Sequence, residues 1–522
     1  MDVSELIEAL NPDQRDAVCA EPGNYLVLAG AGSGKTRVLT HRIAWLNRVF
    51  DVPLYRVLAV TFTNKAAAEM RSRLTALLPD GARGMWVGTF HGIAHRLLRL
   101  HWQDARLPES FQVLDADDQL RLVKRVVADL QLDETRFVPK QLTWWINAHK
   151  DAGRRPGAIQ VAMGDQFTRV QVQVYEEYEL RCQRSGLVDF AEILLRAHET
   201  LLNTPVLLEH YRQRFGQILV DEFQDTNNVQ FAFIRLLAGE RGQVFVVGDD
   251  DQSIYGWRGA QVSNMQKFLN DYPDTRTIRL EQNYRSTGNI LAAANAVIAH
   301  NPERLGKKLW TEDRDGELID LYTAFNEVDE ARHVIGRIQG LIQNGHSASE
   351  CAVLYRNNAQ SRAIEEQLLS NALPYRVYGG QRFFERMEIR DAMAYLRLVA
   401  NRDDDTAFER AVNTPTRGIG DKTLDELRRL ARDSALSLWQ AAGLILSQEA
   451  LNARARNALS GFLDLIVKID GNRDGLELYE LFDGILEQSG LRLHYGKVAK
   501  GELDSRVDNL DATMNARFDV VD

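Results

Sequence analysis

The sequence has 522 residues and a net charge of −10, with 45% hydrophobic and 26% charged residues. This composition indicates a globular protein with a large core and about three or four domains, and it excludes collagen-like and disordered chains. No apolar run approaches the roughly 20 residues that span a bilayer, so no membrane partner is expected.

The cysteines bear on the cellular location that we expect for the protein. Cys19, Cys182 and Cys351 lie far apart and form no CxxC pair. This spacing argues against a zinc site or a disulfide framework. The N-terminal segment is acidic and amphipathic, without a signal-peptide pattern. We therefore expect a reducing, cytoplasmic location.

Short apolar runs alternate with helical stretches along the chain. They lie at residues 24–30, 56–61, 85–90, 217–222 and 243–249, and a mainly helical insertion at about 91–214 interrupts them. This alternation predicts an α/β fold, with a parallel sheet covered by helices on both faces. A second series at 277–282, 317–324, 351–356 and 375–380 predicts a second α/β domain, and from about Phe383 the pattern is helical only.

The segment "AGAGSGKT" follows the first apolar run and precedes a helix. This is the context that a phosphate-binding P-loop requires, because inward-turned N–H groups and the helix N-terminus favour phosphates. Lys35 is expected at the β and γ phosphates of ATP, and the Thr36 hydroxyl at Mg²⁺. A chance glycine-rich turn is the alternative. The predicted ATP-binding residues here are Ala29, Gly30, Ala31, Gly32, Ser33, Gly34, Lys35, Thr36 and Arg37.

Asp221 follows the apolar run 217–220 and is expected at the carboxyl end of a strand, where α/β folds bind ligands. There it would hold Mg²⁺ through water, and Glu222 would act as the general base that orients the attacking water. The alternative is a solvated strand end.

The segment "GDDDQSIYGWRGA" (248–260) combines three carboxylates with Tyr255, Trp257 and Arg258. The carboxylates suit a metal or phosphate site, and the aromatic rings suit base stacking unless they belong to a domain core. Segments 81–101 and 136–155 are basic with interleaved aromatic residues. They indicate either a nucleic-acid track or a solvated helix face with core tryptophans.

Six motifs occur in a characteristic order: the P-loop, "TFTNKAAAEM" (61–70), "GTFHGIAHR" (88–96), "DEFQDTN" (221–227), the 248–260 segment and "LEQNYRST" (280–287). Together they resemble the UvrD/Rep/PcrA family of superfamily 1 DNA helicases over nearly the whole chain. The resemblance implies two RecA-like P-loop domains, the second incomplete, each with a mainly helical insertion.

The resemblance also implies domain boundaries. The first RecA-like domain is expected at 1–90 and 215–280, with its helical insertion at 91–214. The second is expected at 281–378, followed by a helical accessory domain at 379–522. Within the accessory domain, "TPTRGIGDKT" (414–423) resembles a helix-hairpin-helix turn whose Gly418 and Gly420 would meet a duplex phosphate; a plain helix–helix turn is the alternative.

Several site residues are implied by the resemblance alone. Gln14 matches an adenine-reading glutamine, Tyr284 a base-stacking tyrosine, Arg285 an arginine that reaches the γ-phosphate and Gln252 a γ-phosphate sensor. A surface glutamine and core aromatics are the alternatives. The implied DNA contacts are Phe62, Thr63, Asn64, Thr89, His91, Tyr255, Trp257, Arg258 and Arg356. His91 could equally cap or pack a helix.

Two further family motifs, of the kind "TLHSAKGLE" and "RRLAYVGVTRA", do not occur in the 522 residues. We therefore expect a C-terminally truncated chain with an incomplete second domain and reduced activity.

The resemblance implies an ATP- and Mg²⁺-dependent 3′-to-5′ DNA helicase that acts in repair and replication. Its expected partners are single-stranded DNA, single-strand/duplex junctions and possible DNA repair proteins. One alternative is a truncated protein that binds ATP and DNA without unwinding. The other is a P-loop enzyme acting on small molecules.

Overall fold

The computed structural model describes residues 3–78, 83–240, 242–301, 304–357, 360–378, 387–434, 436–448, 451–473, 475–498 and Leu510. The chain forms two compact units, Met1–Ile319 and Asp320–Asp522. Among the helices within these described ranges, none is long and apolar enough to cross a bilayer.

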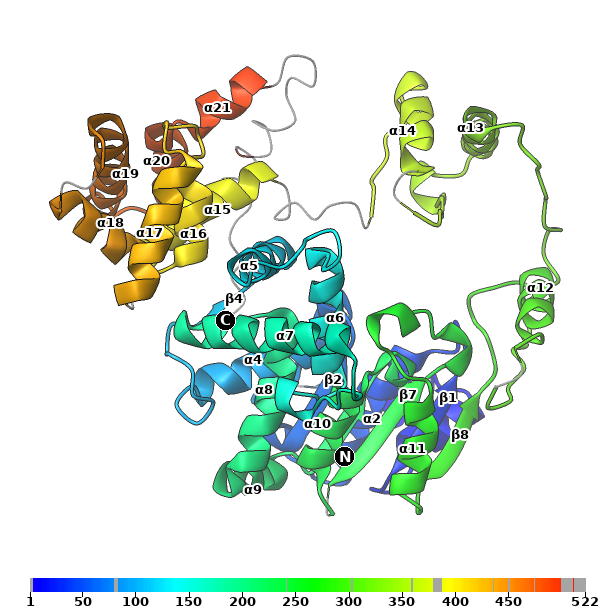
Figure 1. Ribbon diagram of the computed structural model, residues 1–522. Helices are drawn as coiled ribbons and strands as arrows, with labels where there is room; N and C mark the ends of the chain where they lie inside the picture. The colour runs from blue at the N-terminus through cyan, green and yellow to red at the C-terminus, as the bar shows by residue number, and fades with distance from the viewer. Residues whose placement is uncertain are drawn as a thin grey trace. The chain divides into compact units, whose positions relative to one another are not determined.

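Six parallel strands form the central sheet of the first unit (Figure 1). In chain order they are β1 Tyr25–Ala29, β2 Val57–Thr61, β3 Trp86–Thr89, β6 Gln217–Val220, β7 Gln243–Gly248 and β8 Arg276–Leu280. Their spatial order is β3-β2-β6-β7-β1-β8. The first five lie within the predicted apolar runs. β8 pairs with β1 and so belongs to the first sheet. This corrects the apolar-run pattern, which begins the second series at 277, whereas the predicted domain boundary at 280 already leaves β8 in the first domain.

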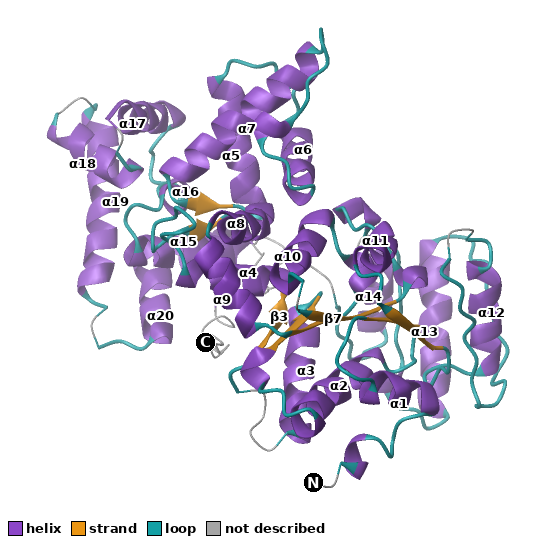
Figure 2. Ribbon diagram, turned by 90° about the horizontal axis from the view of Figure 1, so that it is seen from below, coloured by secondary structure: helices purple, strands orange, loops and turns teal. Residues whose placement is uncertain are grey.

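Alternate residues of the strands enter two separate cores, as expected when helices cover both faces of a sheet. In β1, Val27 packs with α1 Pro12–Cys19, α2 Lys35–Val49 and α3 Asn64–Leu77. Leu26 and Leu28 pack with α4 Phe90–Leu100, α8 Phe190–Asn203, α10 Asn228–Ala238 and α11 Ser263–Asp271. Figure 2 shows the sheet between these two helical layers. The α/β fold class is thereby confirmed.

The long insertion between β3 and β6 is mainly helical, as predicted. Besides α4 and α8 it contains α5 Ala116–Asp129, α6 Pro139–Asp151, α7 Gln166–Arg184 and α9 Pro205–Arg214. A short parallel pair, β4 Gln112–Val113 and β5 Leu187–Val188, joins its two ends. Helices α5, α6 and α7 enclose a core of their own, in which Tyr175 and Tyr178 are fully buried.

Helix α12 Gly288–Ile298 completes the described helices of the first unit. In the second unit, α13 Glu327–Gln343 and α14 Ser361–Ser370 pack against each other. A separate helical core is built by α15 Met387–Ala400, α16 Asp405–Ala411, α17 Asp421–Ser434, α18 Leu438–Ser447, α19 Ala453–Gly471, α20 Leu478–Ser489 and α21 Leu491–Val498.

The remaining runs of the predicted second sheet are not strands. Residues 317–324, 351–355 and 375–377 have no ladder partner in the described chain, and Gly379 and Gly380 of the last run lie outside the described residues. Leu321 is 93% exposed and Leu354 is 95% exposed. A parallel strand is stabilised by neighbours that bond its edges and cover its faces, and these segments lack both. The predicted four-part domain division stays a prediction.

Candidate nucleotide and nucleic-acid site

The predicted site residues of the first unit gather at the carboxyl edge of the central sheet. The P-loop follows β1, Asp221 follows β6 and Tyr284 follows β8, whereas Phe62 follows β2 and Thr89 ends β3. Parallel strands place all these ends together, at the edge where α/β proteins bind ligands. Loop 249–260 follows β7, which lies between β6 and β1 in the sheet.

The P-loop has the backbone geometry that phosphate binding needs. Gly32 and Gly34 have φ values of +68° and +89°, a region that favours glycine. Gly34 is the N-cap of α2, so the helix N-terminus opens directly onto the loop. A Cβ atom at Gly34 would lie 2.7 Å from the Gln14 Nε2 atom. The loop therefore fits a triphosphate held by N–H groups.

Gln14 is buried beneath the P-loop, and its side-chain amide already has partners. Its Nε2 atom donates to the Ser33 carbonyl over 2.8 Å, and its Oε1 atom accepts from the Asn11 N–H over 3.2 Å in the capping box of α1. Adenine recognition by Gln14 would require this amide to exchange those partners. Its position also gives it a second role, which is to support the P-loop.

Lys35 and Glu222 form an ion pair of 3.0 Å between the P-loop and the end of β6. The Gln224 Nε2 atom donates to the same Glu222 Oε2 atom over 2.8 Å. Glu222 has a φ of +51°, which is strained for a residue with a side chain. Such strain, of order 1–3 kcal/mol, concentrates at functional sites, and here it falls on the predicted general base.

Asp221 is buried at the end of β6. Burial, with the neighbouring Glu222 charge, raises the pKa of its carboxyl to about 7, although Lys35 acts in the opposite direction. A divalent cation would compensate the cost of keeping this carboxylate ionised. Thr36, at the second position of α2, offers a hydroxyl oxygen of the kind that Mg²⁺ prefers. This donor set fits Mg²⁺.

Segment 283–285 lies against the P-loop. The Tyr284 N–H donates to the Gly32 carbonyl over 3.0 Å, and the Asn283 amide donates to the Ala31 carbonyl over 2.6 Å. A Cβ atom at Gly32 would lie 2.7 Å from the Arg285 Cβ atom. The Tyr284 ring is half exposed, and its hydroxyl accepts from the Asn11 amide over 2.7 Å. The structure thus brings Tyr284 and Arg285 to the P-loop.

Gln252 connects to the same site through a chain of side chains. It donates to Asp249, whose N–H donates to the Gln224 Oε1 atom over 2.9 Å. Gln224 in turn holds Glu222, which pairs with Lys35. A change in the partner of Lys35 can therefore alter the position of the loop after β7 through these hydrogen bonds.

The three carboxylates of that loop contact lysine and arginine side chains. Lys307 lies 2.5 Å from Asp249, 2.5 Å from Asp250 and 2.9 Å from Asp251. Arg304 binds Asp251 through two hydrogen bonds of 2.8 Å. Asp249, Asp250 and Asp251 are close enough to share a metal ion, but Lys307 already provides a cation there. Their role in this structure is to fix the loop.

Beyond the carboxylates, the loop continues into an aromatic group. Tyr255 stacks on Phe62 with ring centroids 4.9 Å apart, and Trp257 lies 6.4 Å from Tyr255. Trp257 is 74% exposed, so it is not a core residue. The side chain of Arg258 lies outside the described residues. One loop thus links Gln252 to Glu222 through Asp249 and Gln224, and it presents an aromatic surface a few residues later.

The other predicted DNA contacts of this unit lie at helix N-termini. Thr63 and Thr89 are the N-caps of α3 and α4, and exposed Asn64 begins α3. His91 stacks on Phe190 with centroids 3.8 Å apart, and burial lowers the pKa of His91 to about 4. Phe190 is 60% exposed. The sequence reasoning missed it because no family motif includes this insertion residue; only its position beside a helix cap hints at exposure.

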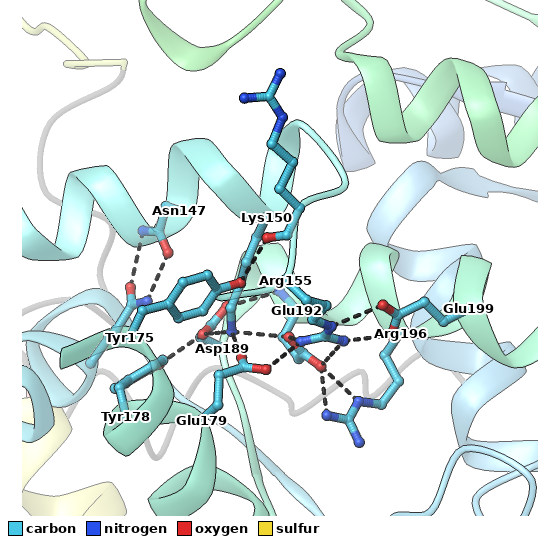
Figure 3. Close-up of polar contacts among 12 residues, drawn as sticks. Asn147, Lys150, Arg155, Tyr175, Tyr178, Glu179, Asp189, Glu192, Arg196 and Glu199 are labelled. Atoms are coloured by element: carbon cyan, nitrogen blue, oxygen red, sulfur yellow. Dashed lines mark hydrogen bonds and ion pairs between the residues drawn. The ribbon is translucent and has the colours of Figure 1, made fainter. Parts of the chain in front are cut away.

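The basic segment 136–155 is only partly available to an outside anion. Lys150 and Arg155 are paired with acidic residues of α7 and α8, as Figure 3 shows. Trp144 is exposed and Trp145 is half-buried against the insertion core. The segment is therefore neither entirely a basic nucleic-acid track nor entirely a solvated helix face with core tryptophans, because some of its residues are exposed and others are neutralised by internal ion pairs.

Two predictions fall in the second unit. Arg356 is exposed, and its N–H donates to the Gln360 side chain over 3.0 Å. Gly418, with a φ of +82°, lies in the turn between α16 and α17. The Arg417 side chain organises this turn by donating to the Ala411 and Ser489 carbonyls. Contact of this turn with DNA stays a prediction.

Comparison with known proteins gives consistent matches. Residues 10–273 match the model of the UvrD/REP helicase N-terminal domain, and residues 278–449 match that of the UvrD-like helicase C-terminal domain. DNA helicase II of Escherichia coli K12 is 58% identical over 516 residues, which are 99% of this chain and 72% of the relative. DNA helicase II of Haemophilus influenzae is 54% identical over 522 residues, covering 99% and 71%. ATP-dependent DNA helicase PcrA of Leuconostoc citreum is 43% identical over 513 residues, covering 98% and 68%.

Proposed function

This chain belongs to the UvrD/REP helicase family, and from that premise we propose that it is an ATP-dependent DNA helicase. In this proposal, ATP hydrolysis drives 3′-to-5′ movement along single-stranded DNA and separation of duplex strands. The observation that carries the proposal is loop 249–260, which bonds Gln224 at one end and stacks Tyr255 on Phe62 at the other. One loop that contacts both ligands can couple them.

In the proposed hydrolysis, Lys35 exchanges its Glu222 partner for phosphate oxygens. Bound Mg-ATP supplies the phosphoanhydride bond that is cleaved and a cation that neutralises developing charge. In this structure the Glu222 Oε2 atom lies 3.0 Å from Lys35 Nζ. When Lys35 turns from Glu222 to the phosphates, this oxygen becomes available to accept a proton from water. This exchange would link phosphate binding to activation of the base.

The remaining nucleotide residues hold and sense the phosphates. Thr36 and Asp221 would hold Mg²⁺, and Arg285 would add positive charge at the γ-phosphate, as an arginine finger does. Gln252 would detect the γ-phosphate from the loop after β7. Gln14 and Tyr284 would flank the adenine, with the Gln14 amide exchanging its present partners as described above.

On the DNA side, the exposed aromatic rings would stack on bases in a sequence-independent manner. Base–aromatic stacking contributes about 1–3 kcal/mol per base. Residues at helix N-termini would contact phosphates through side chains and N–H groups. The proposed DNA contacts are Phe62, Thr63, Asn64, Thr89, His91, Phe190, Tyr255, Trp257, Arg258 and Arg356.

The finer features of the proposal are the preferred substrate and its setting. We propose single-strand/duplex junctions as the DNA substrate, DNA repair proteins as possible partners and the cytoplasm as the location. The relatives named DNA helicase II support DNA as the substrate by similarity.

The test uses the whole chain and a Lys35→Ala control. ATP hydrolysis is measured with and without oligothymidine, and strand displacement is measured on duplexes with either a 3′ or a 5′ single-stranded tail. We expect DNA-stimulated hydrolysis, displacement from the 3′-tailed duplex and neither activity in the control. DNA-stimulated hydrolysis without displacement would instead identify a translocating or DNA-binding ATPase. Hydrolysis that DNA does not stimulate would contradict the proposal.

A further inference from the structure

The C-terminal end of α6 is a junction between the helical insertion and the nucleotide site. Two consecutive residues, Lys150 and Asp151, have different partners. Lys150 binds acidic residues of the insertion, whereas the Asp151 Oδ1 atom accepts from the Asn227 amide over 2.9 Å. Asn227 belongs to the "DEFQDTN" segment that carries Asp221 and Glu222. The junction therefore joins a structural cluster to the catalytic loop.

On the insertion side, the junction is anchored by buried charges (Figure 3). The Lys150 Nζ atom lies 2.6 Å from Asp189, 2.8 Å from Glu179 and 2.9 Å from Glu192. Arg155 also binds Glu192, over 2.7 Å, and so ties the segment after α6 to α8. Removing one member would leave a buried charge uncompensated, so the cluster holds α6, α7 and α8 as one body.

On the catalytic side, Asn227 is held from several directions. Its side chain forms the capping box of α10 with Gln230, and the Asn264 amide donates to its carbonyl over 3.2 Å. The turn after α6 packs here as well, since a Cβ atom at Gly153 would lie 3.5 Å from Val229. The start of α10 thus cannot move without changing its contact with α6.

Asp151 also lies near the aromatic loop. A Cβ atom at Gly259 would lie 3.9 Å from the Asp151 Cβ atom, and Gly259 is two residues from Trp257. Burial and the nearby Asp189 raise the pKa of the Asp151 carboxyl to about 7, and the Asn227 hydrogen bond lowers it. Burying part of a carboxyl group costs free energy unless a hydrogen bond compensates for the lost water, and here the Asn227 amide provides that hydrogen bond.

We propose that Asp151 is a positioning residue that couples the acidic loop 221–227 to the DNA-facing loop 256–260 through its hydrogen bond to Asn227. The inference rests on the proposed helicase function and deepens it, since it assigns part of the ATP–DNA coupling to the insertion. Asp151 touches neither ligand; it acts by fixing the start of α10 against a rigid helical body, at a place where Gly259 lies close to its side chain.

The test measures coupling as a ratio of affinities, which needs no turnover. The Kd of a fluorescent oligothymidine is measured with and without a non-hydrolysable ATP analogue and Mg²⁺. For the parent chain we expect the two Kd values to differ by about 5–150-fold. For Asp151→Ala we expect a ratio within about twofold of one, while the Kd for DNA alone and the Kd for nucleotide alone each change by less than about threefold.

Three further variants separate coupling from folding. Asp151→Asn keeps a hydrogen-bond acceptor and should keep the ratio, whereas Asn227→Asp opposes two carboxylates and should lose it when measured at an alkaline pH at which both are ionised. The double exchange Asp151→Asn/Asn227→Asp restores a donor–acceptor pair and an N-cap acceptor, so it should recover the ratio. Asn147→Ala is the matched control, because it removes another α6 contact, to Gln119 of α5, and should leave the ratio unchanged.

Thermal melting of each variant accompanies the measurements. A parent-like ratio in Asp151→Ala would overturn the inference, as would a parent that binds both ligands with a ratio of one. If Asp151→Ala does not fold, the double exchange decides, since failure to recover the ratio also overturns the inference. A parent that binds neither DNA nor nucleotide would contradict the proposed function itself.

Discussion

Two regions of this protein have similar apolar runs and different structures. In the central sheet, Ile218 and Val220 of β6 are completely buried. In the segments 317–324 and 351–355, comparable residues such as Leu321 and Leu354 are almost completely exposed, and no strand forms. The apolar pattern alone therefore does not make a strand; partners on both edges and a helical layer on each face are also required.

The comparison has a functional side. Every strand end of the central sheet lies within four residues of a proposed site residue; the longest steps are from β7 to Gln252 and from β8 to Tyr284. The extended segments place no such set of side chains together within the described residues. We therefore expect function and stability to respond strongly to changes in the sheet region and weakly to matched changes in the extended region.

The largest contrast is expected in catalysis. Lys35→Ala should reduce ATP turnover by about 10²–10³-fold, because a positioned charge that stabilises the transition state is lost. Arg337→Ala, which removes an exposed cation of α13, should leave turnover unchanged. Steady-state hydrolysis with saturating DNA measures both. A similar loss in the two variants would remove the distinction between the regions.

Stability gives the second contrast. Ile218→Ala should lower the free energy of unfolding of the first unit by about 2–5 kcal/mol, because it leaves a cavity between the sheet and its helices. Leu354→Ala should change stability by less than about 0.5 kcal/mol, because its side chain is already in water. Denaturant titration monitored by circular dichroism gives both values. A large effect of Leu354→Ala would indicate that the 351–355 segment is covered in solution.

DNA binding gives the third contrast, between two exposed aromatic residues. Trp257→Ala should weaken single-stranded DNA binding by about 1–3 kcal/mol through lost stacking, with nucleotide binding unchanged. Phe325, directly after the 317–324 segment, has a ring that is also exposed. Phe325→Ala should therefore have no effect on DNA binding. Fluorescence anisotropy with oligothymidine measures both. Unfolding of the Trp257→Ala protein would point to a structural role instead.

The smallest effect concerns the nucleotide base. Gln14→Ala should weaken ATP binding by about 1 kcal/mol and GTP binding by less, because the amide would pair with adenine. Competition with a fluorescent nucleotide gives both affinities. Equal weakening of ATP and GTP binding would show that the hydrogen bond to Ser33 is the whole role of Gln14.

The parts of this structure that the sequence predicts well are local ones. The P-loop and Asp221 were placed at strand ends because glycine spacing, an apolar run and the following helix are adjacent in the chain. Contacts between residues that are far apart in the sequence could not be predicted in this way. Lys150 lies in a segment whose basic pattern predicts a nucleic-acid track or a solvated helix face, yet its carboxylate partners are Glu179 of α7, Asp189 at the N-cap of α8 and Glu192 of α8.

Strand pairing shows the same limit. The residues of β8 have a strand pattern that is equally compatible with either sheet, and only its pairing with β1 decides the assignment. The 317–324 run has an apolar pattern that predicts a strand, but it has no ladder partner in the described chain. The pattern could not reveal whether such a partner exists. The sequence does not reveal Phe190 as a site residue, because no motif includes it and its stacking partner His91 lies about 100 residues earlier.

The lysine that joins Asp249, Asp250 and Asp251 has a consequence for how this protein responds to its ionic surroundings. Lys307 is tethered by its own backbone, so its effective concentration at these carboxylates far exceeds that of any dissolved ion. Buried pairs are also screened little by salt. The loop that carries Gln252 and Trp257 should therefore keep its shape from low to high ionic strength, and we expect any magnesium dependence to come from the proposed site at Thr36 and Asp221.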